Sequence, residues 1–352
     1  MAEGVMAGSE IAERLIEWLR RELEAPALAF AERPSRLSGG FDTEIFAFRL
    51  TGGPASFSMP LILRLFDPRQ RTDRGLRERV TQNTVAELGF PAPRVLLAIA
   101  DSAGLGGAAL VMERVPGRPL LEAGLVGMSR LLAGLHLRLH ALDAGALRRA
   151  LEAEGRAAGI AALVRDTTLE GAVAALEQRI ESDGLSGLGP AIEWIARHRP
   201  PSTTTAVICH GDFHPQNILV SAGTVAGVID WPNAIIADPA LDVAATKVIL
   251  ELVPVDLAGL AAGARWLVRA ARPIMVGRYL AGYRRRRPLD ARGLAYGEAL
   301  ACLRGLVRAD ENRRRQGALP LNPLDASVFA ERLAARFARI TGISPALPSA
   351  KT

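Results

Sequence analysis

Apolar residues recur at helical spacing towards both ends of the chain. Residues 10 to 23 follow Ser9, a candidate N-cap, and their apolar side chains would share one helix face: Ile11, Leu15, Trp18, Leu19 and Leu23. We therefore expect an amphipathic lead helix that packs on the next elements. A similar spacing runs from about Met128 to Leu142, and residues 145 to 200 and 243 to 345 are typical of further helices. Prolines are expected to separate the helices of the last region: Pro254, Pro273, Pro288 and the stretch from Pro320 to Pro323.

The apolar runs between these helical regions are short and have strand composition. They include Ile45 to Leu50, Leu61 to Phe66 and Ala108 to Glu113, and a further strand is expected after Pro93. Asp73 to Leu88 is helical by composition. At Arg114 to Gly117 the composition changes from strand-like to helical. The sequence thus predicts an α+β protein, with a sheet lobe and its lead helix at 1–113, a hinge at 114–117 and a larger helical lobe at 118–352.

Length and composition are those of a folded globular protein. The chain has 352 residues, of which 49% are apolar, enough to bury the cores of two lobes. The most apolar long segment, Val248 to Ala264, is interrupted by Glu251, Pro254 and Asp256, so we expect no membrane span. The N-terminus lacks a basic patch followed by an apolar core, and a cytoplasmic location is expected.

The positive charge of the chain is concentrated near its C-terminus and is carried by arginine. Residues 243 to 352 hold 19 Lys and Arg against 8 Asp and Glu, a net charge of +11, whereas the whole chain has +6. The two lysines are Lys247 and Lys351. The runs Arg284 to Arg287 and Arg313 to Arg315 either bind a ligand or form solvated helix faces. No aromatic interleaving supports nucleic-acid binding, and the two cysteines, Cys209 and Cys302, lie in core-like surroundings.

The most informative stretch runs from His210 to Asp230. It places Asp212 and Asn217 around a proline, and Asp230 ends a second apolar run, so that one hairpin is expected to gather an acid and two oxygen ligands. Phosphoryl transfer with Mg2+ needs such a set, with Asp212 as the base and Asn217 and Asp230 as metal ligands. His210 and Gly211 would shape the turn. Further along, two acids would accept backbone hydrogen bonds that hold the loop: Asp238 and Asp242.

Two other interpretations of this stretch stay open. Asp, Asn, Gly and Pro are common in turns for backbone reasons, so the segment would also suit a simple loop. His210, Asp212 and His214 would suit a transition-metal site, but that site needs more ligands. The remaining histidines lie in helical contexts, and we interpret His136 and His140 as structural.

The sheet lobe contributes further candidate residues. Ser38, Gly39 and Gly40 would let the backbone approach a phosphate, although a plain hairpin turn is the alternative. Arg64 lies at the centre of an apolar strand and needs a partner if it is buried. Glu78, in the first turns of the next helix, is the favoured partner, and Glu87 competes with it. An exposed edge strand is the other possibility for Arg64.

The chain resembles the aminoglycoside phosphotransferase and choline kinase-like family of small-molecule kinases. The resemblance rests on His210-Gly-Asp-Phe-His-Pro-Gln-Asn-Ile-Leu-Val, on Gly-Val-Ile-Asp-Trp and on Asp238-Pro-Ala-Leu-Asp-Val-Ala, and it spans about residues 30 to 245. It implies a protein-kinase-like two-lobed fold, with an N-terminal antiparallel sheet lobe and ATP between the lobes. It also implies that Asp212 is the catalytic aspartate, that Asn217 and Asp230 bind Mg2+, and that adenine sits on the backbone of Glu113 and Val115. The loop from Ser38 would cover the phosphates.

Two features separate this chain from the family pattern. Members commonly carry a lysine where this chain has Arg64, and an acyl-CoA-dehydrogenase-associated branch carries arginine there. Aminoglycosides are polycations, whereas the C-terminal third here is basic. We therefore expect a neutral or anionic hydroxyl acceptor, such as a hydroxyacyl-CoA or a sugar. A nucleotide-binding pseudokinase-like protein is the alternative, followed by an aminoglycoside or macrolide resistance kinase.

Overall fold

The structure is a computed structural model in which the chain forms two compact units. It describes residues 8–37, 43–66, 73–99, 105, 107–123, 127–201, 205–253, 262–315 and 326–346. The first unit contains Met1–Arg118, Arg149–Leu163 and Ile218–Pro232, and the second contains Pro119–Arg148, Val164–Asn217 and Asn233–Thr352. The backbone therefore passes from one unit to the other at five places in the sequence. The predicted hinge at 114–117 lies just before the first of these places.

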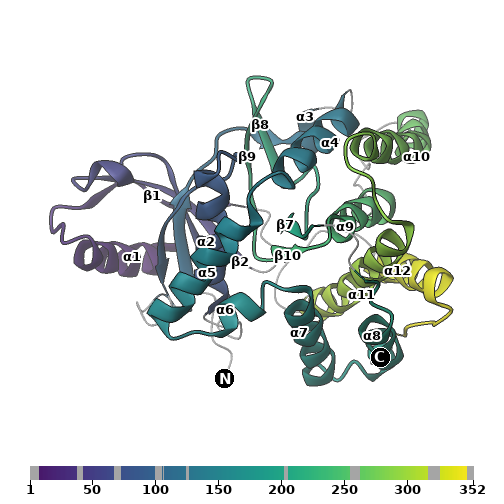
Figure 1. The fold of residues 1–352 in the computed structure, drawn as a ribbon. Coiled ribbons are helices and arrows are strands. Elements are labelled where there is room, and N and C mark those ends of the chain that lie inside the picture. The colour runs from purple at the N-terminus through teal and green to yellow at the C-terminus, as the bar shows by residue number, and fades with distance from the viewer. Residues whose placement is uncertain are drawn as a thin grey trace. The chain divides into compact units, whose positions relative to one another are not determined.

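A five-stranded antiparallel sheet forms the centre of the first unit (Figure 1). Its strands are β1 (Ala29–Leu37), β2 (Thr43–Thr51), β3 (Leu61–Phe66), β4 (Val95–Ile99) and β5 (Ala109–Glu113), in the order β1-β2-β3-β5-β4. A short 3-10 turn, Ala55–Phe57, lies between β2 and β3. The register sets Arg64 of β3 opposite Ile45 of β2 and Leu110 of β5. Arg64 is thus on a strand with neighbours on both sides, and the edge-strand alternative is wrong.

The two faces of this sheet are covered by different helices. The buried residues of α1 (Gly8–Glu22) cluster with Leu61, Leu63 and Leu65 of β3, as the predicted lead helix requires. Successive strand residues point to opposite faces, so Ile62, Arg64 and Phe66 share the other face. There Phe66 belongs to a second apolar cluster, and α2 (Asp73–Glu87) packs against β4 and β5. The strand period therefore turns Arg64 towards the helix that carries Glu78.

A second, three-stranded sheet belongs to the same region, with the order β6-β8-β9. Its strands are β6 (Arg118–Pro119), β8 (Ile218–Ser221) and β9 (Thr224–Val228), and β8 and β9 form an antiparallel hairpin. The hairpin is tied to the first unit because the backbone N–H of Val228 donates to the carbonyl oxygen of Pro91 at 2.7 Å. The Phe90 and Trp231 rings also meet edge to face, with centroids 5.8 Å apart.

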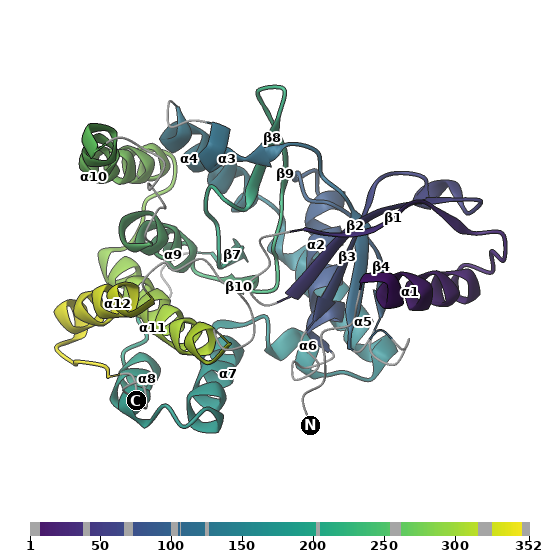
Figure 2. The ribbon, with the colours of Figure 1, turned by 180° about the vertical axis from the view of Figure 1, so that it is seen from behind.

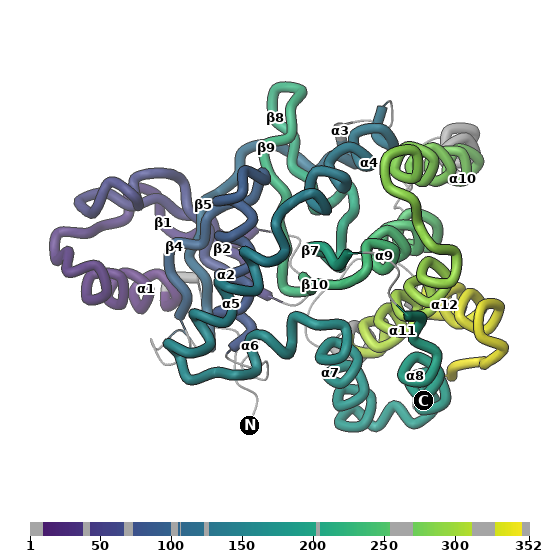
Figure 3. Tube along the Cα trace, viewed as in Figure 1, coloured from purple at the N-terminus to yellow at the C-terminus, as the bar shows by residue number. Residues whose placement is uncertain are grey.

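The second unit is mainly helical (Figures 2 and 3). Its helices are α3 (Leu120–Ala123), α4 (Met128–Leu139), α7 (Leu169–Ser182), α8 (Gly189–Arg197), α9 (Pro239–Leu252), α10 (Ala262–Arg284), α11 (Ala291–Arg315) and α12 (Ala326–Thr341). Helices α5 (Ala144–Ala158) and α6 (Ala162–Arg165) each cross a boundary between the units, and a 3-10 turn, Ser186–Leu188, precedes α8. Helices α9, α11 and α12 lie side by side, and their core includes Leu303, Leu306 and Phe337. The short strands β7 (Val207–Cys209) and β10 (Ile235–Ala237) pair antiparallel.

Two sequence expectations differ from this fold. Pro273 lies inside α10 instead of ending a helix. A helix-interior proline costs roughly 3 kcal/mol, but the helix continues to bury Val276, Tyr279 and Tyr283 in its packing on α4. The expected single hairpin is also wrong, since β7 pairs with β10 and β8 pairs with β9. Within the described residues, no helix combines the length and hydropathy needed to cross a membrane.

Candidate active site

The loop from His210 to Asn217 leaves β7 and leads into β8. Gly211 has a left-handed φ of +77°, and a Cβ atom there would lie 2.4 Å from the carbonyl oxygen of Asn233. Only glycine suits both the conformation and the close approach. The next residue, Asp212, is 9% exposed, and Phe213 is fully buried. The glycine thus turns the chain so that a carboxylate is held in a largely dry position.

Asp212 lies beside two groups that favour its ionised form. Its Oδ1 is 3.4 Å from His214 Nε2, and its Oδ2 is 3.6 Å from an Arg308 guanidinium nitrogen. The other ring nitrogen of His214, Nδ1, accepts from the backbone N–H of Gln216 at 3.3 Å, which fixes the ring beside Asp212. Burial alone would raise the pKa of Asp212, but the His214 hydrogen bond and the charges of His214 and Arg308 lower it well below the usual range. Asp212 is therefore a carboxylate at neutral pH and can accept a proton.

Asn217 closes the same loop with its side chain. Its Nδ2 donates to the carbonyl oxygen of Asp212 at 3.0 Å, and its own N–H donates to the carbonyl oxygen of His214 at 3.0 Å. The amide nitrogen is thereby engaged within the loop. The side-chain oxygen is consequently the atom of Asn217 that suits a cation.

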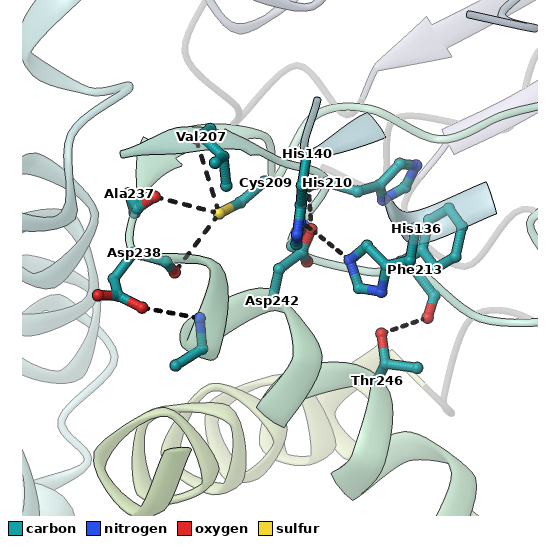
Figure 4. A network of polar contacts seen from close by, with 12 residues as sticks. His136, His140, Val207, Cys209, His210, Phe213, Ala237, Asp238, Asp242 and Thr246 are labelled. Carbon is teal, nitrogen blue, oxygen red and sulfur yellow. Dashed lines mark hydrogen bonds and ion pairs between the residues drawn. The ribbon is translucent and has the colours of Figure 1, made fainter. Parts of the chain in front are cut away.

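Asp242, on α9, holds the loop from inside the second unit (Figure 4). Its Oδ2 accepts from the backbone N–H of His210 at 2.7 Å, and its Oδ1 accepts from that of Gly211 at 2.8 Å. The Nε2 atoms of His136 and His140 lie 3.0 and 3.2 Å from Oδ2. Burial would raise the pKa of Asp242, but the histidines lower it well below the usual range. This fully buried carboxylate therefore accepts hydrogen bonds from four groups.

An outer layer of tyrosines completes the network around Asp242. Tyr279 OH lies 2.7 Å from His136 Nδ1, and Tyr283 OH lies 2.6 Å from His140 Nδ1. Burial, followed by the neighbouring His136, lowers the pKa of His140 to about 4, so this ring is neutral at pH 7. A neutral ring that accepts from tyrosine at Nδ1 can donate from Nε2 to Asp242.

The network bears on the transition-metal alternative. Among the described residues, the set that could hold a metal is His136, His140 and Asp242, whose ligand atoms lie within 4.8 Å of one another. It does not contain Asp212, and both nitrogens of each ring already have partners. The structure therefore supports the structural interpretation of both histidines.

Further supports of the loop come from α9 and α4. Thr246 Oγ1 donates to the carbonyl oxygen of Phe213 at 2.8 Å, and the Phe213 ring stacks on His136 with centroids 4.3 Å apart. Asp238 accepts from the N–H of Ala240 at 2.8 Å and so caps α9 (Figure 4). Asp238 thus fixes the helix that carries Asp242, whereas Asp242 contacts the loop itself.

Arg64 is the centre of a second polar cluster, which lies within the first unit. Its guanidinium donates to Glu78 Oε1 at 2.5 Å and to Asp230 Oδ1 at 2.8 Å, and its Nε donates to Thr43 Oγ1 at 3.1 Å. Glu78, not Glu87, is therefore the partner of Arg64. Burial raises the pKa of Glu78, against the opposing charge of Arg64. Asp230 itself has a left-handed φ of +70°, an unusual conformation for a residue other than glycine.

The other predicted nucleotide contacts are only partly described. Glu113 ends β5 and accepts from the backbone N–H of Arg94 through Oε2 at 3.0 Å. Val115 packs over Gly227 of β9, where an added Cβ would lie 3.0 Å from its methyl groups. Ser38, Gly39 and Gly40 lie outside the described residues.

Several residues of the site were missed from the sequence. They are Thr246, Tyr279, Tyr283 and Arg308. Tyr279 and Tyr283 are four residues apart, as His136 and His140 are. This matching spacing could have predicted that α10 packs against α4. No local pattern marks Arg308 among the many arginines downstream.

Comparison with known proteins agrees with this fold. The profile of the phosphotransferase enzyme family matches residues 34–289. Acyl-CoA dehydrogenase family member 11 of Pongo abelii is 28% identical over 178 residues, which are 48% of this chain and 22% of that protein. The chain thus spans only about a fifth of that relative's length. An aminoglycoside 3'-phosphotransferase of Streptomyces fradiae is 29% identical over 234 residues, which are 60% of this chain and 78% of that enzyme.

A solved structure shows the same fold over nearly the whole chain. It is that of amicoumacin kinase in complex with AMP-PNP, Ca2+ and Ami, which is 18% identical, covers 90% of each chain and has a TM-score of 0.55. The antiparallel sheet followed by a helical region is therefore the kinase-like arrangement that the sequence predicted. From its matched residues and its fold, the chain belongs to the phosphotransferase enzyme family.

Proposed function

We propose that the chain transfers the γ-phosphoryl group of ATP to a hydroxyl group of a small molecule, with Mg2+ as the metal. The observation that carries this proposal is the state of Asp212. It is an ionised carboxylate on a loop that Asp242, Thr246 and Asn217 fix through hydrogen bonds. Phosphoryl transfer requires little covalent chemistry from the protein, but it requires a group that is positioned to take the proton of the attacking hydroxyl.

The donor atoms of two further residues suit Mg2+. Asn217 offers an amide oxygen, because its nitrogen is engaged within the loop. Asp230 offers Oδ2, because its Oδ1 accepts from Arg64. Mg2+ prefers such oxygen ligands together with phosphate and water. We assign the metal to these residues, where it would neutralise charge on the phosphates.

The first unit supplies the groups proposed for the nucleotide. Arg64, fixed by Glu78, offers a charge for the phosphates, and the backbone of Glu113 and Val115 would read the adenine edge. The glycine loop from Ser38 to Gly40 would cover the phosphates. The AMP-PNP complex of amicoumacin kinase supports a nucleotide site in this fold.

In the proposed reaction, Asp212 accepts the proton of the acceptor hydroxyl. The hydroxyl oxygen forms a bond to the γ-phosphorus as the bond from that phosphorus to the β,γ-bridging oxygen breaks, and ADP leaves. The second unit's rigid loop holds the base in place during this exchange. Removal of such a base typically slows turnover by roughly 100- to 10,000-fold.

The proposed acceptor is a neutral or anionic alcohol, hydroxyacyl-CoA-like or sugar-like. The net charge of +11 over residues 243 to 352 and the match to acyl-CoA dehydrogenase family member 11 support this class. An aminoglycoside acceptor is the second candidate, because the match to the Streptomyces fradiae enzyme covers 78% of that protein.

The test is ADP release with ATP, Mg2+ and a panel of hydroxylated metabolites that includes aminoglycosides. Asp212→Asn should slow turnover by roughly 100- to 10,000-fold, whereas Asp183→Asn, which removes a carboxylate from the end of α7, should leave the rate unchanged. Turnover of Asp212→Asn at the wild-type rate would show that the base is assigned wrongly. If ATP raises the melting temperature but no acceptor yields product, the chain is instead a nucleotide-binding pseudokinase-like protein.

A further inference from the structure

Helix α10 and the turn that follows it carry a dense positive charge. Residues 262 to 287 contain eight arginines and no aspartate or glutamate. Helix α4, which packs along α10, has no acidic residue either. Both helices belong to the second unit, and α10 lies at the outside of that unit (Figures 1 and 2). The sequence left two roles open for this charge, which are ligand binding and a solvated helix face.

The arginines of this segment divide into two groups. Two of them hold the fold, because Arg272 donates to the carbonyl oxygens of Glu251 and Val253, and Arg287 donates to that of His140 at 2.7 Å. Four others have exposed side chains: Arg278, Arg284, Arg285 and Arg286. Within the described part of the chain, no carboxylate pairs with any of these four. Their charge therefore faces solvent and does not hold the fold.

The exposed residues of α10 share one face of the helix. They recur at intervals of three or four positions: Ile274, Arg278, Ala281, Arg284 and Arg285. The backbone N–H of Arg285 donates to the carbonyl oxygen of Ala281 at 3.2 Å, so the helical spacing extends to Arg285. The buried residues lie on the opposite face: Val276, Tyr279 and Tyr283.

Ile274 adds an apolar side chain to this basic face. It is 60% exposed, which is the largest exposure of a large apolar residue in the described ranges. The helix dipole accounts for arginines in the last turn, because cations are favourable near a helix C-terminus. It accounts neither for Arg278, more than one turn earlier, nor for an exposed isoleucine. Both are typical of a surface that meets anionic lipid, where the headgroups attract arginine and the acyl boundary accepts aliphatic side chains.

A lipid surface fits this face better than a nucleic acid does. Proteins that bind nucleic acids combine basic residues with aromatic side chains that stack on bases. Among the described residues, the exposed large apolar side chains are Ile274 and Val328, and both are aliphatic. We propose that the basic face of α10, formed by Ile274, Arg278, Arg284 and Arg285, adsorbs the protein onto anionic phospholipid membranes. No described helix can cross a bilayer, so the contact is peripheral.

The experiment measures how the full chain sediments with sucrose-loaded vesicles. One set of vesicles is phosphatidylcholine alone, and the other is phosphatidylcholine with phosphatidylserine at about a 7:3 ratio. We expect binding that requires phosphatidylserine and that weakens as salt rises from about 0.05 to 0.5 M. Adsorption needs no catalytic step, so the measurement is independent of phosphoryl transfer.

Two variants of the face itself should weaken binding in different ways. The triple variant Arg278→Gln, Arg284→Gln and Arg285→Gln should reduce the partition coefficient by roughly 100-fold and flatten its salt dependence. Ile274→Ser should reduce the coefficient by roughly 3- to 10-fold and leave the salt dependence unchanged, because it removes an apolar contact only.

Two matched controls separate adsorption from other causes. Arg156, Arg332 and Arg339 are exposed on α5 and α12, and their joint replacement by glutamine makes the same change in net charge. That variant should have an unchanged partition coefficient. Replacement of the three α10 arginines by lysine keeps the charge but removes the guanidinium fork. It should retain most of the binding, because a bilayer surface attracts charge without requiring a fork.

Each outcome supports or overturns the proposal. Equal binding to phosphatidylcholine alone, or an equal loss in the two glutamine triple variants, would overturn it. Loss of binding in the lysine variant would also overturn it, because a discrete phosphate site would then explain the data. Absence of vesicle binding would do the same, and retention on RNA under those conditions would assign the face to nucleic acid. Melting temperatures show which variants fold, and Ile274→Ser with the lipid and salt dependence of the wild type decides if the glutamine triple variant does not.

Discussion

Replacing Asp242 by asparagine should remove much of the stability of the second unit. The carboxylate accepts from the backbone of His210 and Gly211 and from the rings of His136 and His140. An asparagine side chain has one acceptor oxygen and a nitrogen that only donates. In the better orientation of the asparagine side chain, its oxygen takes the place of Oδ2 and keeps the three donors found there. Its NH2 group then takes the place of Oδ1 and faces the N–H of Gly211.

The expected loss follows from these four contacts. A buried N–H left without a partner costs roughly 1–3 kcal/mol, and the three remaining bonds weaken because the acceptor is no longer charged. Together we expect a decrease of roughly 3–5 kcal/mol in the free energy of unfolding. Because Gly211 precedes Asp212, turnover should fall as well.

The assay is urea unfolding followed by tryptophan fluorescence, with Asp238→Asn as the matched control. Asp238 is also an acid at the start of α9, where it caps the helix by accepting from the backbone N–H of Ala240, and asparagine caps helices as well as aspartate does. The control should lose less than about 1 kcal/mol. A loss in Asp242→Asn no larger than that of the control would refute the idea that the carboxylate holds the loop.

Three further predictions follow from single contacts. Arg64→Lys should lower the unfolding free energy by roughly 1–3 kcal/mol, seen in thermal melts, because an ammonium cannot fork between Glu78 and Asp230; a stability equal to wild type would contradict this. The pKa of His140 is lowered from 6.5 to about 4 in the folded chain. As pH decreases, His140 is therefore protonated in the unfolded chain before it is protonated in the folded chain. The free energy of unfolding should decrease by about 3 kcal/mol between pH 6.5 and pH 4. His140→Gln should flatten that profile in urea titrations, and an equally steep decline would count against the assignment. Gly211→Ala should destabilise the chain and impair turnover, because the new Cβ atom clashes with Asn233. Gly223→Ala has a similar φ of +79° but open space around it, and should lower the free energy of unfolding by only about 1–2 kcal/mol. Equal effects of the two substitutions would mean that the clash at Gly211 is relieved.

Local patterns in the sequence were enough to predict the elements and part of the site. The strand Leu61–Phe66 was predicted with its observed bounds, since one apolar run forms one buried strand. Glu78 could be paired with Arg64 because the two are close in sequence and the helix phase decides which side faces the sheet. Asp212 and Asn217 share a loop, as their spacing suggested.

Contacts between distant segments were not predictable in this way. Arg64 reaches Asp230 across 166 positions, and no periodicity encodes that distance. The pairing of Cys209 with Ile235 replaced the expected local hairpin, because nothing in a short apolar run identifies its partner strand. Arg308 is one of many arginines, and only packing selects it.

The division of the chain has a consequence for its synthesis. The first unit includes residues 218 to 232, and the bond from Val228 to Pro91 belongs to its packing. When Arg118 has left the ribosome, this unit still lacks its last sheet, and at 5–20 residues per second the missing segment, which ends at Pro232, is complete roughly 6 to 23 seconds later. During that interval most of the second unit's early helices are made. The nascent chain therefore cannot complete its units one after the other, and a fragment that ends at Arg118 would lack a part that its own fold requires.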